Sequence, residues 1–214
     1  MCDPLRYDIR GIAVENQKSC AKKITKLIRI ITLAPVMALA TLVTLFIKDA
    51  SLFGGVHNFV LAVTFLGVLP LLAYPLQPVI PHFKDKGREG QRTLAMIFAV
   101  CGYILGCIMG LILSATPVLW FIYLEYLISG ALIMVFNKVL GLRASAHACG
   151  VIGPAVMLAY FGVPWALIPG IALYALAFWA SVKMERHTAS QFIGGAIIPV
   201  AVLVVLAVIF KALA

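Results

Sequence analysis

Residues 192–210 read FIGGAIIPVAVLVVLAVIF, a run of the chain that contains no charged side chain. A helix that crosses the hydrocarbon core of a bilayer needs about 17–25 residues of this kind. The whole chain of 214 residues has the same character, since 63% of it is hydrophobic and only 12% is charged. Soluble domains are about 45–50% apolar and about 25% charged. The sequence therefore predicts an all-α, polytopic membrane protein, folded as one helical bundle.

Six other apolar segments accompany this run. With it, the predicted spans are residues 30–47, 59–76, 94–113, 117–136, 146–161, 164–182 and 192–210. The fifth span is short, and it reaches a usable length only if its first turn includes polar residues. We therefore expect about six or seven transmembrane helices in residues 30–214, preceded by a basic cytoplasmic segment, residues 1–29.

Glycine and proline refine this prediction at two places. The stretch GYILGCIMG (102–110) puts three glycines on one helix face, which favours close packing against a neighbouring helix over a ligand site. The stretch YPLQPVIP (74–81) has three prolines, so we expect the second span to end in an extended segment.

The basic residues predict how the chain is oriented. Eleven Lys and Arg residues lie in the N-terminal segment and in the connection after the second span, which are on the same side of the membrane. Only Lys48 and Lys211 lie on the opposite side. These counts leave out the four basic residues of the candidate site described below. By the positive-inside rule, the N-terminus faces the cytoplasm. Because this rule accounts for the net charge of +9, we expect no nucleic-acid partner.

Two polar clusters interrupt the apolar sequence, and both fall on the predicted cytoplasmic side. The first cluster, in NKVLGLRASAHACG (137–150), consists of Lys138, Arg143, Ser145 and His147. It leads into the start of a helix, where free N–H groups and the helix dipole favour an anion.

The second cluster lies in SVKMERHTASQFIGGA (181–196) and consists of Lys183, Arg186, His187 and Gln191. His187 and Gln191 are four residues apart, so they share a face if the helix has already begun. Gln191 could then accept a hydrogen bond from the His187 ring. Thr188 or Ser190 could cap the same helix.

Together the two clusters predict a pocket for a phosphate group. Arg and Lys bind phosphate oxygens, one histidine attacks phosphorus and the other protonates the leaving oxygen. The alternative interpretation is structural: basic side chains that extend to the membrane interface, and hydroxyl groups that cap helices.

At these residues the sequence resembles the type-two phosphatidic acid phosphatases of the acid phosphatase–haloperoxidase superfamily. Their motifs are K-x-x-x-x-x-x-R-P, then P-S-G-H, then S-R-x-x-x-x-x-H-x-x-x-D. Arg143, Ser145 and His147 form R-x-S-x-H, which is similar to the K-I-S-x-H of one branch of that family. HTASQ, starting at His187, is similar to the H-T-x-x-Q of the same branch. The resemblance covers the chain from about residue 117 onward.

The resemblance implies a helical bundle that hydrolyses a lipid phosphate or diphosphate through a phosphohistidine, without a metal or other cofactor. It implies that His187 is the nucleophile, His147 the general acid and Gln191 the group that orients His187. Arg143, Ser145, Lys138, Lys183 and Arg186 would bind the phosphate. The chain departs from the family pattern at Ser181, where members carry Arg, and at Gln191, where most carry Asp.

The functional hypothesis is thus an integral membrane lipid phosphatase whose active site faces the cytoplasm. Its substrate would be an isoprenyl diphosphate, which a small site favours, or a phosphatidate-type lipid. The alternative is a non-catalytic binder or transporter of phosphorylated lipids on the same scaffold. The sequence leaves the oligomeric state open. We interpret Glu125, inside the fourth span, as a packing residue. We interpret the basic residues at 84–92 mainly as a determinant of topology, although together with His82 they could attract an anionic headgroup.

Overall fold

A computed structural model of the chain describes residues 27–28, 30–183 and 188–213. These residues form helices joined by short turns, and no strand occurs among them. The α-helices are α2 (Ala34–Lys48), α3 (Val56–Ala62), α4 (Leu69–Leu76), α5 (Gly87–Ile112), α6 (Pro117–Met134), α7 (Ala146–Tyr160), α8 (Leu167–Lys183) and α9 (Ala189–Leu213). Shorter helical pieces are η1 (Ala50–Phe53), η2 (Val63–Val68), η3 (Val135–Val139) and η4 (Pro164–Ala166).

The prediction of an all-α bundle is confirmed, and each of the seven predicted spans corresponds to a helix. Five continuous helices are long and apolar enough to cross a membrane: Val56–Leu76, Gly87–Ile112, Pro117–Val139, Pro164–Lys183 and Ala189–Leu213. The helices α2 and α7 are apolar but shorter, with 15 residues each. At 1.5 Å per residue each is about 22 Å long, which is less than the thickness of the hydrocarbon core.

The surface of the bundle identifies a membrane protein. Large apolar side chains are exposed along the helices, among them Ile168 (74% exposed), Leu111 (71%) and Val208 (65%). Soluble monomers rarely expose apolar surface on this scale, whereas side chains that face lipid are apolar. The chain is therefore a polytopic membrane protein.

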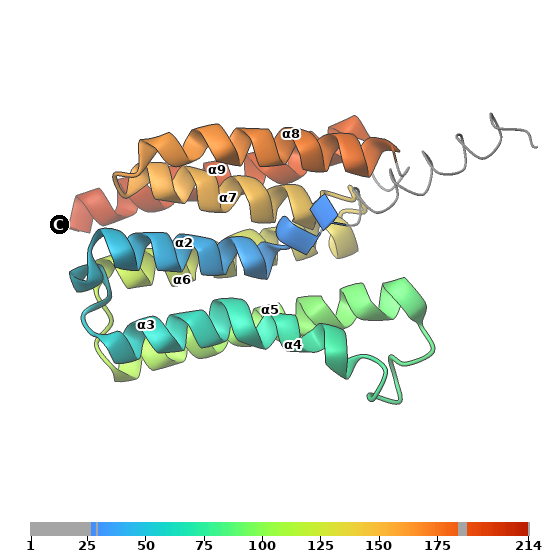
Figure 1. Ribbon diagram of the computed structural model, residues 1–214, viewed down its shortest axis with the longest axis horizontal. Helices are drawn as coiled ribbons and strands as arrows, with labels where there is room; N and C mark the ends of the chain where they lie inside the picture. Colours follow the sequence, from blue (N-terminus) through green and yellow to red (C-terminus); the bar gives the residue numbers. More distant parts are fainter. Residues whose placement is uncertain (1–26, 29, 184–187, 214) are drawn as a thin grey trace, which may run out of the picture.

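The helices run side by side along the long axis of the molecule (Figure 1). At one side of the bundle α7 packs against α2, α8 and α9, and at the other side α5 packs against α4 and α6. Contacts between α6 and α9 and between α2 and η2 join the two sides. The turn between α4 and α5 and the start of α7 lie at the same end of the bundle, opposite the C-terminus (Figure 1).

Small residues let α7 sit at the centre of its layer. A Cβ atom added to Gly150 would lie 2.4 Å from Cβ of Ala34 on α2, and one added to Gly153 would lie 3.1 Å from Cβ of Pro199 on α9. Neighbouring helices thus shield α7 from lipid, which explains how a short helix with a polar first turn is accommodated in this bundle.

The glycine face predicted on α5 is also a packing face. A Cβ atom at Gly102 would lie 2.2 Å from the carbonyl oxygen of Phe65, and one at Gly106 would lie 2.6 Å from the ring of Tyr123. The prediction of close helix packing at these glycines is confirmed.

The structure corrects the prediction for residues 74–81. Pro75 lies inside α4, and the chain then forms hydrogen-bonded turns rather than an extended segment. The backbone N–H groups of Val79 and Ile80 both donate to the carbonyl oxygen of Leu76, at 3.0 and 3.1 Å. Proline lacks an N–H donor but keeps its carbonyl, so turns can form around the prolines where neighbouring residues supply the donors.

Candidate functional site

The two polar clusters, far apart in the sequence, meet where α7 and α9 begin. The backbone N–H of Ser145 donates to the carbonyl oxygen of Gln191, with a distance of 2.9 Å between nitrogen and oxygen. Gly195, one turn further along α9, lies against the same residue, since an added Cβ atom there would lie 2.2 Å from the carbonyl oxygen of Ser145. The first cluster therefore lies directly beside the described part of the second.

Ser145 is the N-cap of α7. Its side-chain oxygen accepts a hydrogen bond from the backbone N–H of Ala148 at 3.3 Å, and the residue is fully buried. The hydroxyl thus satisfies one of the free N–H groups of the first turn. The structure shows this capping role, while the predicted role in binding phosphate stays a prediction.

Thr188 and Gln191 form a capping box at the start of α9. The hydroxyl of Thr188 accepts from the backbone N–H of Gln191, and the side-chain oxygen of Gln191 accepts from the backbone N–H of Thr188, both at 3.3 Å. This is the reciprocal arrangement that Thr-x-x-Gln favours at a helix start. Of the two predicted capping residues, Thr188 is the one that caps, and Gln191 has a structural role that the sequence prediction did not assign.

His147 lies in the first turn of α7 and is half-buried. Its Nε2 atom lies 2.8 Å from the hydroxyl oxygen of Thr32, and that hydroxyl donates to the carbonyl oxygen of Ile28 at 2.6 Å. A threonine hydroxyl has a single proton, so the bond to His147 requires the proton on Nε2. Thr32, which is fully buried, thereby orients the ring of His147.

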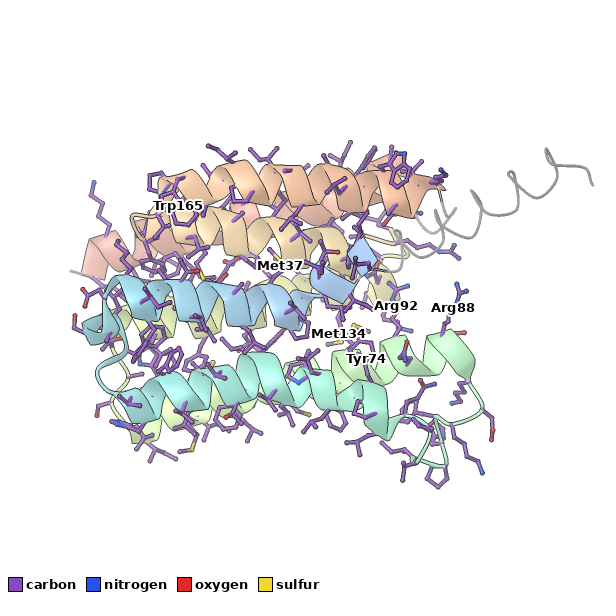
Figure 2. All side chains as sticks on the ribbon, viewed as in Figure 1. Met37, Tyr74, Arg88, Arg92, Met134 and Trp165 are labelled. Atoms are coloured by element: carbon purple, nitrogen blue, oxygen red, sulfur yellow. The ribbon has the colours of Figure 1, made fainter. Side chains whose placement is uncertain are left out.

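His147 also lines a cavity of about 460 Å³ between the two sides of the bundle. This volume is within the range of small-molecule pockets in proteins, roughly 300–1,000 Å³. At the end near His147 the wall includes Arg88, Gln91 and Arg92 of α5. Figure 2 shows Arg88 and Arg92 extending from the start of α5 toward the layer that contains α2. The cavity thus combines a histidine, two guanidinium groups and a largely apolar interior.

Of the remaining basic residues of the two clusters, the three that the structure describes are not in the wall of this cavity. Lys138 and Arg143 are exposed, and Arg143 has a left-handed backbone with φ of 50°. The ammonium group of Lys183 lies 4.6 Å from the centre of the Trp179 ring, a cation–π contact. Arg186 and His187 lie outside the described residues. The predicted phosphate roles of all these side chains stay predictions.

The arginines of α5 are not among the predicted site residues, although their basic segment was expected to be able to attract an anionic headgroup. The predicted span began at residue 94, but α5 begins at Gly87 and its first two turns are polar. A search for apolar segments assigns such turns to a loop. The available signal was the spacing of Arg88 and Arg92, because residues four apart on a helix lie on one face.

Glu125 lies deeper in the wall of the same cavity and is only 2% exposed. Its Oε1 atom accepts a hydrogen bond from the Ser129 hydroxyl at 3.2 Å, and its Oε2 atom has no hydrogen-bond partner among the described residues. Glu125 is therefore part of the cavity wall, which the interpretation as a packing residue did not anticipate.

Within the part of the chain that the structure describes, no group of three His, Cys, Asp or Glu side chains is arranged to hold a metal ion. No protein-family model, curated protein or solved structure matches the chain. The residues of the cavity and of the two clusters are consequently the basis for proposing a function.

Proposed function

We propose that this protein is a membrane phosphatase that removes a phosphate or diphosphate group from a lipid. The observation that carries the proposal is the convergence of the two polar clusters beside a cavity whose wall includes His147, Arg88 and Arg92. Guanidinium groups bind phosphate oxygens, and an apolar cavity suits a lipid chain.

In the proposed reaction, His187 attacks the terminal phosphorus. The bond that breaks joins this phosphorus to the lipid oxygen in a monophosphate, or to the bridging oxygen in a diphosphate. His147 gives a proton to that leaving oxygen, which releases the dephosphorylated lipid. Water then attacks the phosphorus of the phosphohistidine while His147 takes up a proton from that water molecule. The bond from phosphorus to the His187 nitrogen breaks, and inorganic phosphate leaves. His187 lies outside the described residues, so its role rests on its place in the second cluster and on the resemblance of HTASQ to the family motif.

The arginines of α5 support the proposal because they supply positive charge that this chain lacks at Ser181. Ser181, which stands at the position of the motif arginine, lines the same cavity as Arg88 and Arg92. Each charge-assisted hydrogen bond to a phosphate oxygen contributes about 1.5–3 kcal/mol. Two guanidinium groups would thus compensate for the neutral serine.

The orientation of the site forms part of the same proposal. The start of α7 and the basic turn between α4 and α5 lie at one end of the bundle (Figure 1). The positive-inside rule assigns this end to the cytoplasm. The phosphate group would therefore come from the cytoplasmic leaflet.

A non-catalytic binder or transporter of phosphorylated lipids is the alternative, and one observation favours it. The side-chain oxygen of Gln191 accepts from Thr188 in the capping box, and a neutral amide stabilises a charged imidazole less than a carboxylate does. Such a protein would bind the same lipids and release no phosphate.

Phosphate release by the purified protein discriminates between the two functions. The substrates are dioleoyl phosphatidate and geranylgeranyl diphosphate in mixed detergent micelles. We expect release of inorganic phosphate from at least one of them, abolished by His187→Ala and reduced at least about 100-fold by His147→Gln, in the range for general acid catalysis. His57→Gln, which changes an exposed histidine outside the cavity, is the matched control and should retain full turnover. Equal turnover in His187→Ala and the unmodified protein would rule out the phosphohistidine mechanism.

A further inference from the structure

The buried carboxyl group of Glu125 is a polar feature of the cavity that the proposed hydrolysis does not use. It is 2% exposed, and it lies in the same wall as His147. Polar groups this deep in a membrane protein are costly unless they have partners, and such groups frequently bind ligands.

The hydrogen-bonding pattern of Glu125 indicates which kind of ligand atom could pair with its second carboxyl oxygen. The Ser129 hydroxyl donates to Oε1, so the second oxygen, Oε2, carries the proton when the carboxyl is neutral. An ionised carboxylate buried without a cation costs several kcal/mol, which favours this neutral form. Because Oε2 has no partner among the described residues, the group has one O–H donor that needs an acceptor.

The depth of this donor below the phosphate end of the cavity can be estimated along α7. An added Cβ atom on Gly153 would lie 3.9 Å from Oε1 of Glu125, so the carboxyl is level with Gly153. His147 precedes Gly153 by six residues on the same helix, which corresponds to about 9 Å at 1.5 Å per residue. The donor therefore lies just below the headgroup, in the region where a glycerolipid carries its ester carbonyl groups.

We propose that Glu125 donates a hydrogen bond to an ester carbonyl oxygen of the lipid, so that the cavity selects a glycerol-based lipid phosphate. An isoprenyl chain has only carbon and hydrogen at this depth and would leave the donor unpaired. The inference rests on the proposed lipid-phosphate function and narrows its substrate class. It also reverses the preference for an isoprenyl diphosphate that the sequence analysis derived from a small site.

The test compares two lipids that differ only in the acceptor. Binding of dioleoyl phosphatidate and of its dialkyl-ether analogue, which lacks the carbonyl oxygens, is measured with the purified full-length protein. A neutral hydrogen bond contributes about 0.5–1.5 kcal/mol, so we expect the ester lipid to bind roughly 2–10-fold more tightly.

Variants assign this preference to the carboxyl group. Glu125→Gln keeps an N–H donor and should keep the preference, whereas Glu125→Leu should lower the ratio of the two affinities to about one. Glu89→Leu, which removes an exposed carboxyl on α5 outside the cavity wall, is the matched control and should keep the ratio. If Glu125→Leu does not fold, the ratio of the affinities for the ester and ether lipids is measured for the unmodified protein and for Glu125→Gln. Both proteins should prefer the ester lipid.

The outcomes separate this inference from the proposed hydrolysis. Equal affinity for the two lipids in the unmodified protein, or an equal ratio in Glu125→Leu, would overturn the inference even if phosphate is released. A preference for the ester lipid that depends on Glu125, without any release of phosphate, would support the inference and reject the phosphatase.

Discussion

Replacing Gly195 by alanine tests the contact that joins the two polar clusters. The added Cβ atom would lie 2.2 Å from the carbonyl oxygen and 2.8 Å from the nitrogen of Ser145. Both are backbone atoms at the N-cap of α7, so no side-chain rotation relieves the overlap. The start of α9 would have to move away from α7, which would stretch the 2.9 Å hydrogen bond between Ser145 and Gln191.

The magnitude follows from three contributions. Overpacking of a tight contact costs about 1–3 kcal/mol, and a weakened hydrogen bond adds about 0.5–1.5 kcal/mol. Alanine offsets about 0.8–1 kcal/mol of this through its higher helix propensity. We therefore expect Gly195→Ala to lower the free energy of unfolding by about 0.5–4 kcal/mol and to reduce phosphate release by displacing the second cluster from His147.

The adjacent glycine provides the control. A Cβ atom added to Gly194 meets nothing within 4 Å, so Gly194→Ala should raise the free energy of unfolding by up to about 1 kcal/mol. Unfolding of the purified variants in detergent, followed by tryptophan fluorescence, measures both effects, and phosphate release is assayed on the same samples. If Gly195→Ala matched Gly194→Ala in stability and in turnover, the described contact between α7 and α9 would be wrong.

Three further predictions concern the other contacts of the site. Thr32→Val removes the hydrogen-bond acceptor for Nε2 of His147. We expect kcat to fall roughly 3–10-fold and its pH profile to shift, with KM unchanged. An unaltered pH profile would reject this contact. Arg92→Gln should raise KM for the lipid phosphate at least about tenfold, because it removes a charge-assisted hydrogen bond. Arg88→Gln should raise KM for the same reason. An unchanged KM in both variants would exclude α5 from the site. Gln191→Ala should lower the free energy of unfolding by about 1 kcal/mol through loss of the capping box, whereas Gln191→Glu should not; equal stability of the two variants would contradict that cap.

The helices could be predicted from the sequence because hydrophobicity alone determines where a chain crosses a membrane. The run 192–210 lies within α9, and the glycine face 102–110 packs as predicted because glycine leaves room for a neighbouring helix. The prediction of an extended segment at residues 74–81 is wrong, because neighbouring residues supply the backbone N–H donors that close turns around the prolines.

The wall of the cavity could not be predicted in the same way. Arg88 and Arg92 looked like topology signals because hydropathy does not extend a helix into its polar first turns. The position of Glu125 beside Gly153 depends on how α6 and α7 pack, which no local pattern encodes. The capping role of Gln191 could have been predicted from Thr-x-x-Gln, a spacing that favours a capping box at a helix start.

A structure of the protein with bound orthovanadate would show whether the two clusters form one phosphate site. Vanadate mimics the five-coordinate phosphorus of the transfer step, so it should bond to a ring nitrogen of His187. His147 should lie within hydrogen-bond distance of the opposite oxygen, with Arg88 or Arg92 on the remaining oxygens. Vanadate bound away from His187, or the rings of His147 and His187 facing separate cavities, would mean that the two clusters do not form one phosphate site.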